Sequence, residues 1–154
     1  MNVIEIWQKL NRFPGGAFLF NKILARKVPY TGSIGAEILE IKEGYAHVQM
    51  SDKRAIRNHL NSIHAVALMN LAELTTGLAV MSAVPKEARA IIKGLSIEYI
   101  KKARGTIRAE ATQEKILANE SREFFIETVL KDSSGEIVSK AKAHWLVGPR
   151  PEKK

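Results

Sequence analysis

The sequence predicts an α+β fold in which an antiparallel sheet wraps around one long central helix. Residues 65–84 are apolar on nearly every face, which is typical of a helix enclosed by other structure. Two strand-like runs precede this segment and four follow it. A sandwich or a closed barrel would leave such a helix without a place to be buried, so a sheet curved around the helix fits the pattern best.

We expect residues 1–30 to form a helical N-terminal extension. The apolar faces of its two helices carry Val3, Ile4, Trp7 and Leu10 in the first and Phe18, Phe20, Ile23 and Leu24 in the second. The run Pro14-Gly15-Gly16 separates them, and the second helix should span residues 17–27. We expect these helices to cover the sheet or to line a ligand tunnel; the alternative is a helix lying on a membrane surface.

Strands account for most of the remaining chain. The first pair should span residues 34–41 and 45–50, joined by a turn that ends at Gly44. After the central helix, strands are expected over 90–101, with Gly94 as a bulge, and over 106–112, following a turn at Gly105. The last pair should cover 121–131 and 136–147, where alternating residue types predict one covered and one solvated face.

Composition restricts the classes of function. With 154 residues the chain fits a single domain over residues 1–154, with a flexible tail over 149–154. Cysteine is absent, which excludes disulfides and thiolate sites and suits a cytoplasmic protein. Because the histidines lack metal-ligand spacing, we predict no metal. No Gly-rich phosphate loop occurs and nothing in the sequence suggests a redox cofactor, so we predict no cofactor. The acid Glu5 and the lack of a basic leader argue against a secretory signal at the start of the chain.

Charge and hydropathy bear on two further classes of protein, those that bind nucleic acid and those that span a membrane. The net charge of +8 favours a polyanionic ligand, and nucleic acid, anionic lipid and coenzyme A all qualify. Nucleic-acid binding would rest on charge alone, because no basic strand face carries interleaved aromatic residues; we therefore predict no nucleic-acid partner. We also predict no membrane span over residues 65–84, since Glu73 near its centre would cost about 2.5 to 3.5 kcal/mol.

The central helix carries the most informative polar residues. Burial should raise the pKa of Glu73, which is the usual condition of a catalytic carboxylate. Asn61, Ser62 and His64 precede the helix as capping candidates, so its first free amides should point toward an acceptor of negative charge. Glu73 lies roughly 13 Å from this end along the axis, at about 1.5 Å per residue, so a second subunit would have to supply the missing half of a site.

These residues form part of a pattern that resembles the motif of a known family. The pattern Asn58-x-x-Asn61-x-x-His64-Ala65-Val66-x-x-x-x-Leu71-Ala72-Glu73 resembles the Asn-x-x-Gly-x-x-His-Gly-Gly-x-x-x-x-Leu-Ala-Asp signature of hotdog-fold acyl-CoA thioesterases of the phenylacetate-pathway type. The expected strand order extends the resemblance across residues 32–148.

Three departures from that signature bear on the site. Ala65 and Val66 replace two glycines, which keeps both N–H donors but narrows the approach of a thioester. Asn61 replaces a glycine and tolerates a left-handed turn. Glu73 replaces an aspartate, as it does in another branch of hotdog thioesterases.

The resemblance implies a role for each residue. Glu73 would act as nucleophile or general base on an acyl-CoA thioester, and the Ala65 N–H would hold the developing oxyanion. Asn58 would orient the water or the thioester, and His64 would help to fix the loop. The resemblance also implies a homodimer, or a homotetramer built from two dimers, with sites shared between copies.

Substrate contacts can be assigned less directly. We expect Val66, Met69 and Thr76 to line the acyl site, although the Thr76 hydroxyl could instead bond to its own helix carbonyls. Lys101, Lys102 and Arg104 cluster at a strand end and are candidates for the nucleotide end of coenzyme A, which enters as part of the substrate. Two rival functions stay open: a non-catalytic acyl-CoA-binding or regulatory protein, and a dehydratase or hydratase of 3-hydroxyacyl thioesters.

Overall fold

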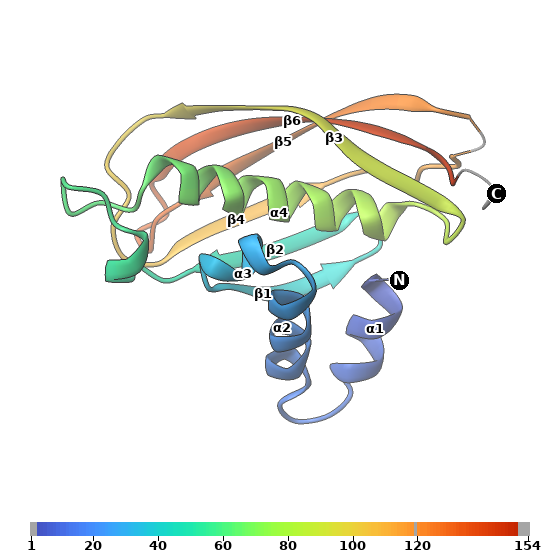
Figure 1. Cartoon of the computed structure of the whole chain (residues 1–154), viewed down its shortest axis with the longest axis horizontal. Helices are drawn as coiled ribbons and strands as arrows, with labels where there is room; N and C mark the ends of the chain where they lie inside the picture. Colours follow the sequence, from blue (N-terminus) through green and yellow to red (C-terminus); the bar gives the residue numbers. More distant parts are fainter. Residues whose placement is uncertain (1–2, 119, 151–154) are drawn as a thin grey trace.

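The computed structural model describes residues 3–118 and 120–150 and has the predicted architecture, an antiparallel sheet curved around a long helix (Figure 1). Within these residues the sheet has 6 strands in the order β1-β2-β4-β5-β6-β3. The helices are α1 (Val3–Leu10), α2 (Gly16–Lys27), α3 (Pro29–Ser33) and α4 (Ala65–Ala83), with a short 3-10 helix η1 (Arg54–Ile56). The strands are β1 (Ala36–Lys42), β2 (Tyr45–Met50), β3 (Ala88–Tyr99), β4 (Ile107–Thr112), β5 (Arg122–Lys131) and β6 (Ile137–Pro149).

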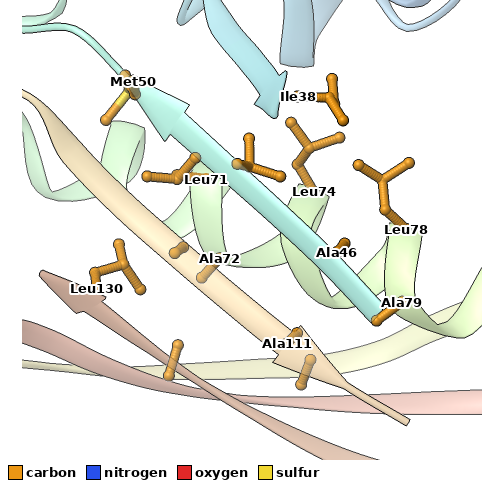
Figure 2. Packing of buried hydrophobic residues seen from close by; sticks show 14 of the residues in the cluster. Ile38, Ala46, Met50, Leu71, Ala72, Leu74, Leu78, Ala79, Ala111 and Leu130 are labelled. Carbon is orange, nitrogen blue, oxygen red and sulfur yellow. The ribbon is translucent and has the colours of Figure 1, made fainter. Parts of the chain in front are cut away.

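Helix α4 forms the centre of the hydrophobic core. It ends at Ala83, and the next residues, Val84 and Pro85, cannot continue it, because proline lacks an N–H and favours an extended residue before it. Small residues line both sides of the contact between the helix and the sheet, and Figure 2 labels Ala72 and Ala79 of α4 and Ala46 and Ala111 of β2 and β4. Because these side chains are short, the helix packs close to the strands. Although α4 is long and apolar enough to cross a membrane, most of it is buried inside this soluble-type fold.

Local signals in the sequence place the turns and the bulge correctly. Gly44 closes the β1–β2 hairpin with a φ of 70°, a conformation that glycine adopts without steric cost. The β3–β6 pairing shifts register between Ile92 and Gly94, which confirms the predicted bulge. In β6, residues 139–147 alternate between buried and more exposed positions, as the sequence pattern predicts.

The two edge strands of the sheet, β1 and β3, differ in whether another element covers their outer backbone groups. At β1, the Asn21 side chain of α2 accepts a hydrogen bond from the Ile38 N–H at 2.8 Å and donates one to the Ile38 carbonyl at 3.3 Å. Helix α2 therefore covers this edge with a side chain that replaces a neighbouring strand. At the other edge, β3 has 12 residues, and most of them are exposed or half-buried. Its outer backbone groups are available to another strand.

The ends of the chain correct one expectation. Helices α1, α2 and α3 form the predicted N-terminal extension, in which Trp7 packs edge-to-face on Phe20 with ring centroids 5.1 Å apart. The prediction of a flexible tail over 149–154 is wrong for its first two residues. Pro149 belongs to β6, and the Arg150 side chain donates to the Ala88 carbonyl at 3.0 Å. The rest of that segment, 151–154, lies outside the described residues, as do residues 1–2 of the predicted extension.

Candidate functional site

One face of α4 is left partly uncovered by the sheet. Along this face, half-buried or exposed residues recur every three or four positions, the spacing of a single helix face. We call this face the α4 stripe; it consists of Val66, Met69, Glu73, Gly77 and Met81. All of its members except Glu73 are apolar. The stripe therefore presents a surface suited to an apolar ligand or a second protein chain, with a single carboxylate at its centre.

The Glu73 carboxylate is half-buried and has no hydrogen-bond or ion-pair partner within residues 3–118 and 120–150. Burial removes part of its hydration and raises the pKa of the Glu73 carboxyl above its ordinary value. An unpaired carboxylate in such a place destabilises the fold, and it is also the state in which a carboxylate acts as a base. This environment agrees with the sequence-based expectation for Glu73.

The backbone N–H groups at the start of α4 differ in whether they are free to donate a hydrogen bond to a ligand. His64 is the N-cap, and its Nδ1 accepts a hydrogen bond from the Val66 N–H at 3.1 Å. The Ala67 and Leu68 N–H groups donate to the His64 carbonyl at 2.9 and 3.2 Å. Among the described residues, the Ala65 N–H has no acceptor. It is therefore the amide at the positive end of the helix dipole that remains free for an oxyanion.

The loop before α4 is held by Asn58. Its Oδ1 accepts hydrogen bonds from the Leu60 and Ser62 N–H groups at 3.0 and 3.2 Å, so this oxygen serves the loop and not a substrate. The prediction that Asn58 orients water or a thioester can therefore apply only to its Nδ2. Asn61 adopts a φ of 52°, which confirms that it occupies the left-handed turn expected at this position.

A groove of about 260 Å³ lies beside the free Ala65 amide. Its walls come from the loop, the start of α4 and the end of β3, and its lining includes Asn58, Ala65, Lys101 and Lys102. Tyr99 also lines the groove, and its hydroxyl donates to the Ala65 carbonyl at 3.0 Å. The sequence analysis missed Tyr99 because nothing in the chain indicates that the end of β3 meets the start of α4.

The basic cluster is only partly free to bind phosphate. The Lys101 ammonium pairs with Asp132 at 2.6 Å and also with Glu136, so its charge is neutralised within the fold. Arg104 donates from Nε to the Asn61 carbonyl at 3.1 Å and thereby holds the loop. Lys101 and Arg104 already have partners within the fold, and their role in binding the nucleotide end of coenzyme A stays a prediction. Lys102 is exposed and forms no ion pair with a described residue.

Thr76 lies off the exposed face of α4, and its hydroxyl bonds to the Ala72 and Glu73 carbonyls of its own helix. Its side chain is 0% exposed, donates to the Ala72 carbonyl at 3.0 Å and accepts from the Trp145 indole N–H at 3.3 Å. The predicted substrate contact of Thr76 is therefore wrong, and the alternative bond to its own helix is the one that forms. Gly77 beside it leaves room for the Trp145 ring, which lies 3.1 Å from the position a Cβ would take.

Asn70 is a second polar residue that the sequence analysis did not select. It is 6% exposed; its Nδ2 donates to the Tyr30 carbonyl at 3.3 Å, and its Oδ1 has no partner among the described residues. Asn70 precedes Glu73 by three positions and so lies beside it on the helix. Its contact with Tyr30 joins α3 to the helix that carries the carboxylate.

Other polar surfaces lie away from these residues. A hollow of about 440 Å³ on the outer side of the sheet is lined by Tyr45 of β2 and by residues of β4, β5 and the β5–β6 turn, and it includes none of the predicted site residues. In the described part of the chain, no three histidine, aspartate or glutamate side chains come together as a metal site would require. The groove beside Ala65 and the α4 stripe are therefore the candidate site.

Comparison with known proteins places this geometry in a family. Residues 16–147 match the family described as "Domain of unknown function (DUF4442)". A protein of Archaeoglobus fulgidus named "Putative esterase" is 36% identical over 110 residues, which cover 71% of this chain and 68% of that protein.

Solved structures share the whole fold. A structural genomics crystal structure has a TM-score of 0.83 at 27% identity, covering 96% of this chain and 99% of that chain. A Pseudomonas aeruginosa protein named "Probable Thioesterase" has a TM-score of 0.78 at 24% identity, covering 90% and 97%. A hypothetical thioesterase of Streptococcus pneumoniae, solved with coenzyme A, has a TM-score of 0.67 at 18% identity, covering 82% and 99%. The chain thus belongs to the DUF4442 family, and its fold is the hotdog fold of the thioesterases that it resembles.

Proposed function

We propose that this protein hydrolyses an acyl-CoA thioester, using Glu73 as the base or nucleophile. The observation that carries the proposal is the half-buried, unpartnered Glu73 carboxylate at the centre of an otherwise apolar helix face. The names of the relatives support the same reaction class, and coenzyme A in the Streptococcus pneumoniae structure supports the choice of thiol.

The reaction needs few groups. Glu73 takes a proton from water as the hydroxide adds to the thioester carbonyl, and the Ala65 N–H donates to the oxyanion that forms. The tetrahedral intermediate then breaks its C–S bond, releasing the free acid, while the proton passes to the coenzyme A thiolate. If Glu73 attacks directly, the C–S bond breaks and the coenzyme A thiolate leaves, which gives an acyl anhydride on the Glu73 carboxylate; water then hydrolyses the anhydride to the free acid and restores the carboxylate.

Both groups belong to one helix yet are too far apart to meet within it. Because Glu73 lies about 13 Å from the helix start along the axis, we propose that the Ala65 N–H of one copy serves the Glu73 of the other. The uncovered edge of β3 supports such a dimer, since a long edge strand readily pairs with a second copy. The apolar α4 stripes then pack on each other or on the acyl chain, and two dimers can form a tetramer.

A panel of acyl-CoA substrates with a thiol reagent tests the proposal. Glu73→Gln should lower kcat by at least about 10³-fold while acyl-CoA binding is retained, because the amide keeps the volume of the side chain but cannot accept a proton. Glu114→Gln, at an exposed position in the loop after β4, is the matched control and should keep full activity. Full turnover by Glu73→Gln would refute the assignment.

One observation favours a second function, non-catalytic binding of acyl-CoA. The Val66 N–H is already bonded to His64, and the Val66 side chain is 47% exposed where the family signature has a glycine. A side chain there restricts the approach of a thioester to the Ala65 amide. Binding of every chain length without turnover would favour this function, whereas a change in enoyl-thioester absorbance would indicate a dehydratase or hydratase.

A further inference from the structure

The hairpin formed by α1, α2 and their connection extends away from the sheet, on the side opposite β3, β5 and β6 (Figure 1). Its outer surface carries large apolar side chains that contact little of the fold. Phe13 is 70% exposed, Phe18 68% and Leu19 48%. Large apolar side chains grouped on a protruding surface of a water-soluble fold indicate an interaction site.

The same hairpin is strongly basic, and its one acidic residue among those described, Glu5, pairs with Lys86. Residues 6–36 contain five basic residues and no acidic residue, and the basic ones are Lys9, Arg12, Lys22, Arg26 and Lys27. All five are exposed. Within the described chain, Arg12, Lys22, Arg26 and Lys27 form no ion pair, although the fold pairs many of its other basic side chains with carboxylates. Their charges are therefore available to an anionic partner.

The apolar and basic residues share one face of α2. Phe18 and Lys22 are four residues apart, and the Lys22 ammonium lies 5.4 Å from the centre of the Phe18 ring. Leu19 and Arg26 extend this face by the same helical spacing. The opposite face holds the buried Phe20 and the Asn21 bonds to β1, so the exposed face is not needed to attach the helix to the sheet.

We propose that this hairpin docks the protein onto an anionic lipid bilayer. Phe13, Phe18 and Leu19 enter the boundary between headgroups and acyl chains, while the surrounding cations bind the lipid phosphates. A second copy of the chain fits this face poorly, because an isologous contact brings cations against cations. A bilayer is favoured over nucleic acid or an acidic protein because the aromatic side chains at a convex tip gain an apolar environment only there. The docking does not depend on the proposed hydrolysis.

Vesicle cosedimentation of the full-length protein tests this docking. The protein should bind phosphatidylcholine vesicles that contain about a third phosphatidylserine, fail to bind pure phosphatidylcholine, and dissociate at high salt. Lys22→Glu with Arg26→Glu should weaken binding at least about tenfold. The matched control, Lys131→Glu with Lys140→Glu, makes the same change of charge at exposed positions on the sheet and should bind nearly as well as the native protein. Phe18→Ser should lower binding about tenfold without any change of charge.

Two results would overturn the proposal: no binding to the anionic vesicles, or an equal loss in the hairpin and control variants. Binding to DNA or an acidic protein, with none to vesicles, would likewise assign the surface to another partner.

A second experiment measures which part of the protein enters the bilayer. Because the chain has no cysteine, a single introduced cysteine can carry an environment-sensitive dye that reports insertion at that position. The fluorescence emission of a dye attached to Asn11→Cys should shift to shorter wavelength on anionic vesicles. The emission of a dye attached to Ser133→Cys, an exposed position in the β5–β6 turn, should not shift. Equal responses at the two positions would contradict docking through the hairpin.

Discussion

The Glu73 carboxyl weakens the fold that contains it. Burial raises the pKa of the Glu73 carboxyl, so the folded state binds this proton more tightly than the unfolded state does and is destabilised when the group ionises. The stabilisation that comes from protonated Glu73 is fully present below the ordinary pKa of glutamate. It is lost as the pH rises through the raised pKa of the folded state. Natural proteins keep such a destabilising group where function requires it.

Glu73→Gln should therefore stabilise the protein at neutral pH. Glutamine resembles the protonated carboxyl, so the variant avoids the penalty that the native protein incurs above the pKa of Glu73. Melting temperatures should be higher for the variant at neutral pH and should converge with those of the native protein below the ordinary pKa of glutamate. A variant that is less stable than the native protein at neutral pH would show that the Glu73 carboxylate has a favourable partner.

The Ala65 amide can be removed without a change elsewhere. Ala65 is the first residue of α4, where proline is tolerated, and His64 before it has φ −65° and ψ 140°, a conformation compatible with a following proline. Ala65→Pro should lower kcat about 10²- to 10³-fold, the usual cost of one oxyanion donor, with an unchanged circular dichroism spectrum. Ala65→Ser, which keeps the N–H, is the control. Unchanged turnover in Ala65→Pro would remove this amide from the mechanism.

The turn at Asn61 tolerates few residues. Its φ of 52° is accessible to glycine and asparagine but strained for a β-branched residue. Asn61→Gly should leave stability nearly unchanged, and Asn61→Val should cost about 1–2 kcal/mol. The urea midpoints of the two variants measure the difference, and equal midpoints would contradict a left-handed turn.

At the scale of elements, the attachment of α2 to β1 depends on one side chain. Asn21→Leu leaves the Ile38 N–H and carbonyl without partners at a sheet edge, which should cost about 1–3 kcal/mol. Urea unfolding measures this loss, and Asn11→Leu, at an exposed position in the α1–α2 connection, should show little change. A similar loss in both variants would argue that the Asn21 bonds contribute nothing specific.

Elements and single residues differ in how well the sequence predicts them. The strands, α4, the Gly94 bulge and the Asn61 turn follow from local signals such as periodicity and glycine placement, which act over a few residues. The ion pairs of Lys101 with Asp132 and Glu136, and the Tyr99 contact with α4, join segments more than 30 residues apart. No local pattern encodes these contacts, so the sequence analysis anticipated neither the ion pairs of Lys101 nor the position of Tyr99 beside Ala65.

At the scale of the whole molecule, the covered β1 edge and the open β3 edge predict how copies associate. We expect a homodimer or a dimer of dimers in light scattering, because β3 and the α4 stripe are the partly uncovered parts of the core. A monomer at micromolar concentration would contradict a site shared between copies. Because the hairpin lies on the side opposite β3, dimerisation through β3 leaves it free to contact lipid (Figure 1).

Complementation between inactive variants tests the shared site most directly. Glu73→Gln and Ala65→Pro are each inactive as homodimers in this account, because every site lacks either the carboxylate or the amide. When the two variants are unfolded and refolded together in equal amounts, about half of the dimers are mixed, and each mixed dimer has one intact site. The account predicts recovery of about a quarter of the native turnover with an acyl-CoA substrate. No recovery, despite mixed dimers isolated by two affinity tags, would contradict it.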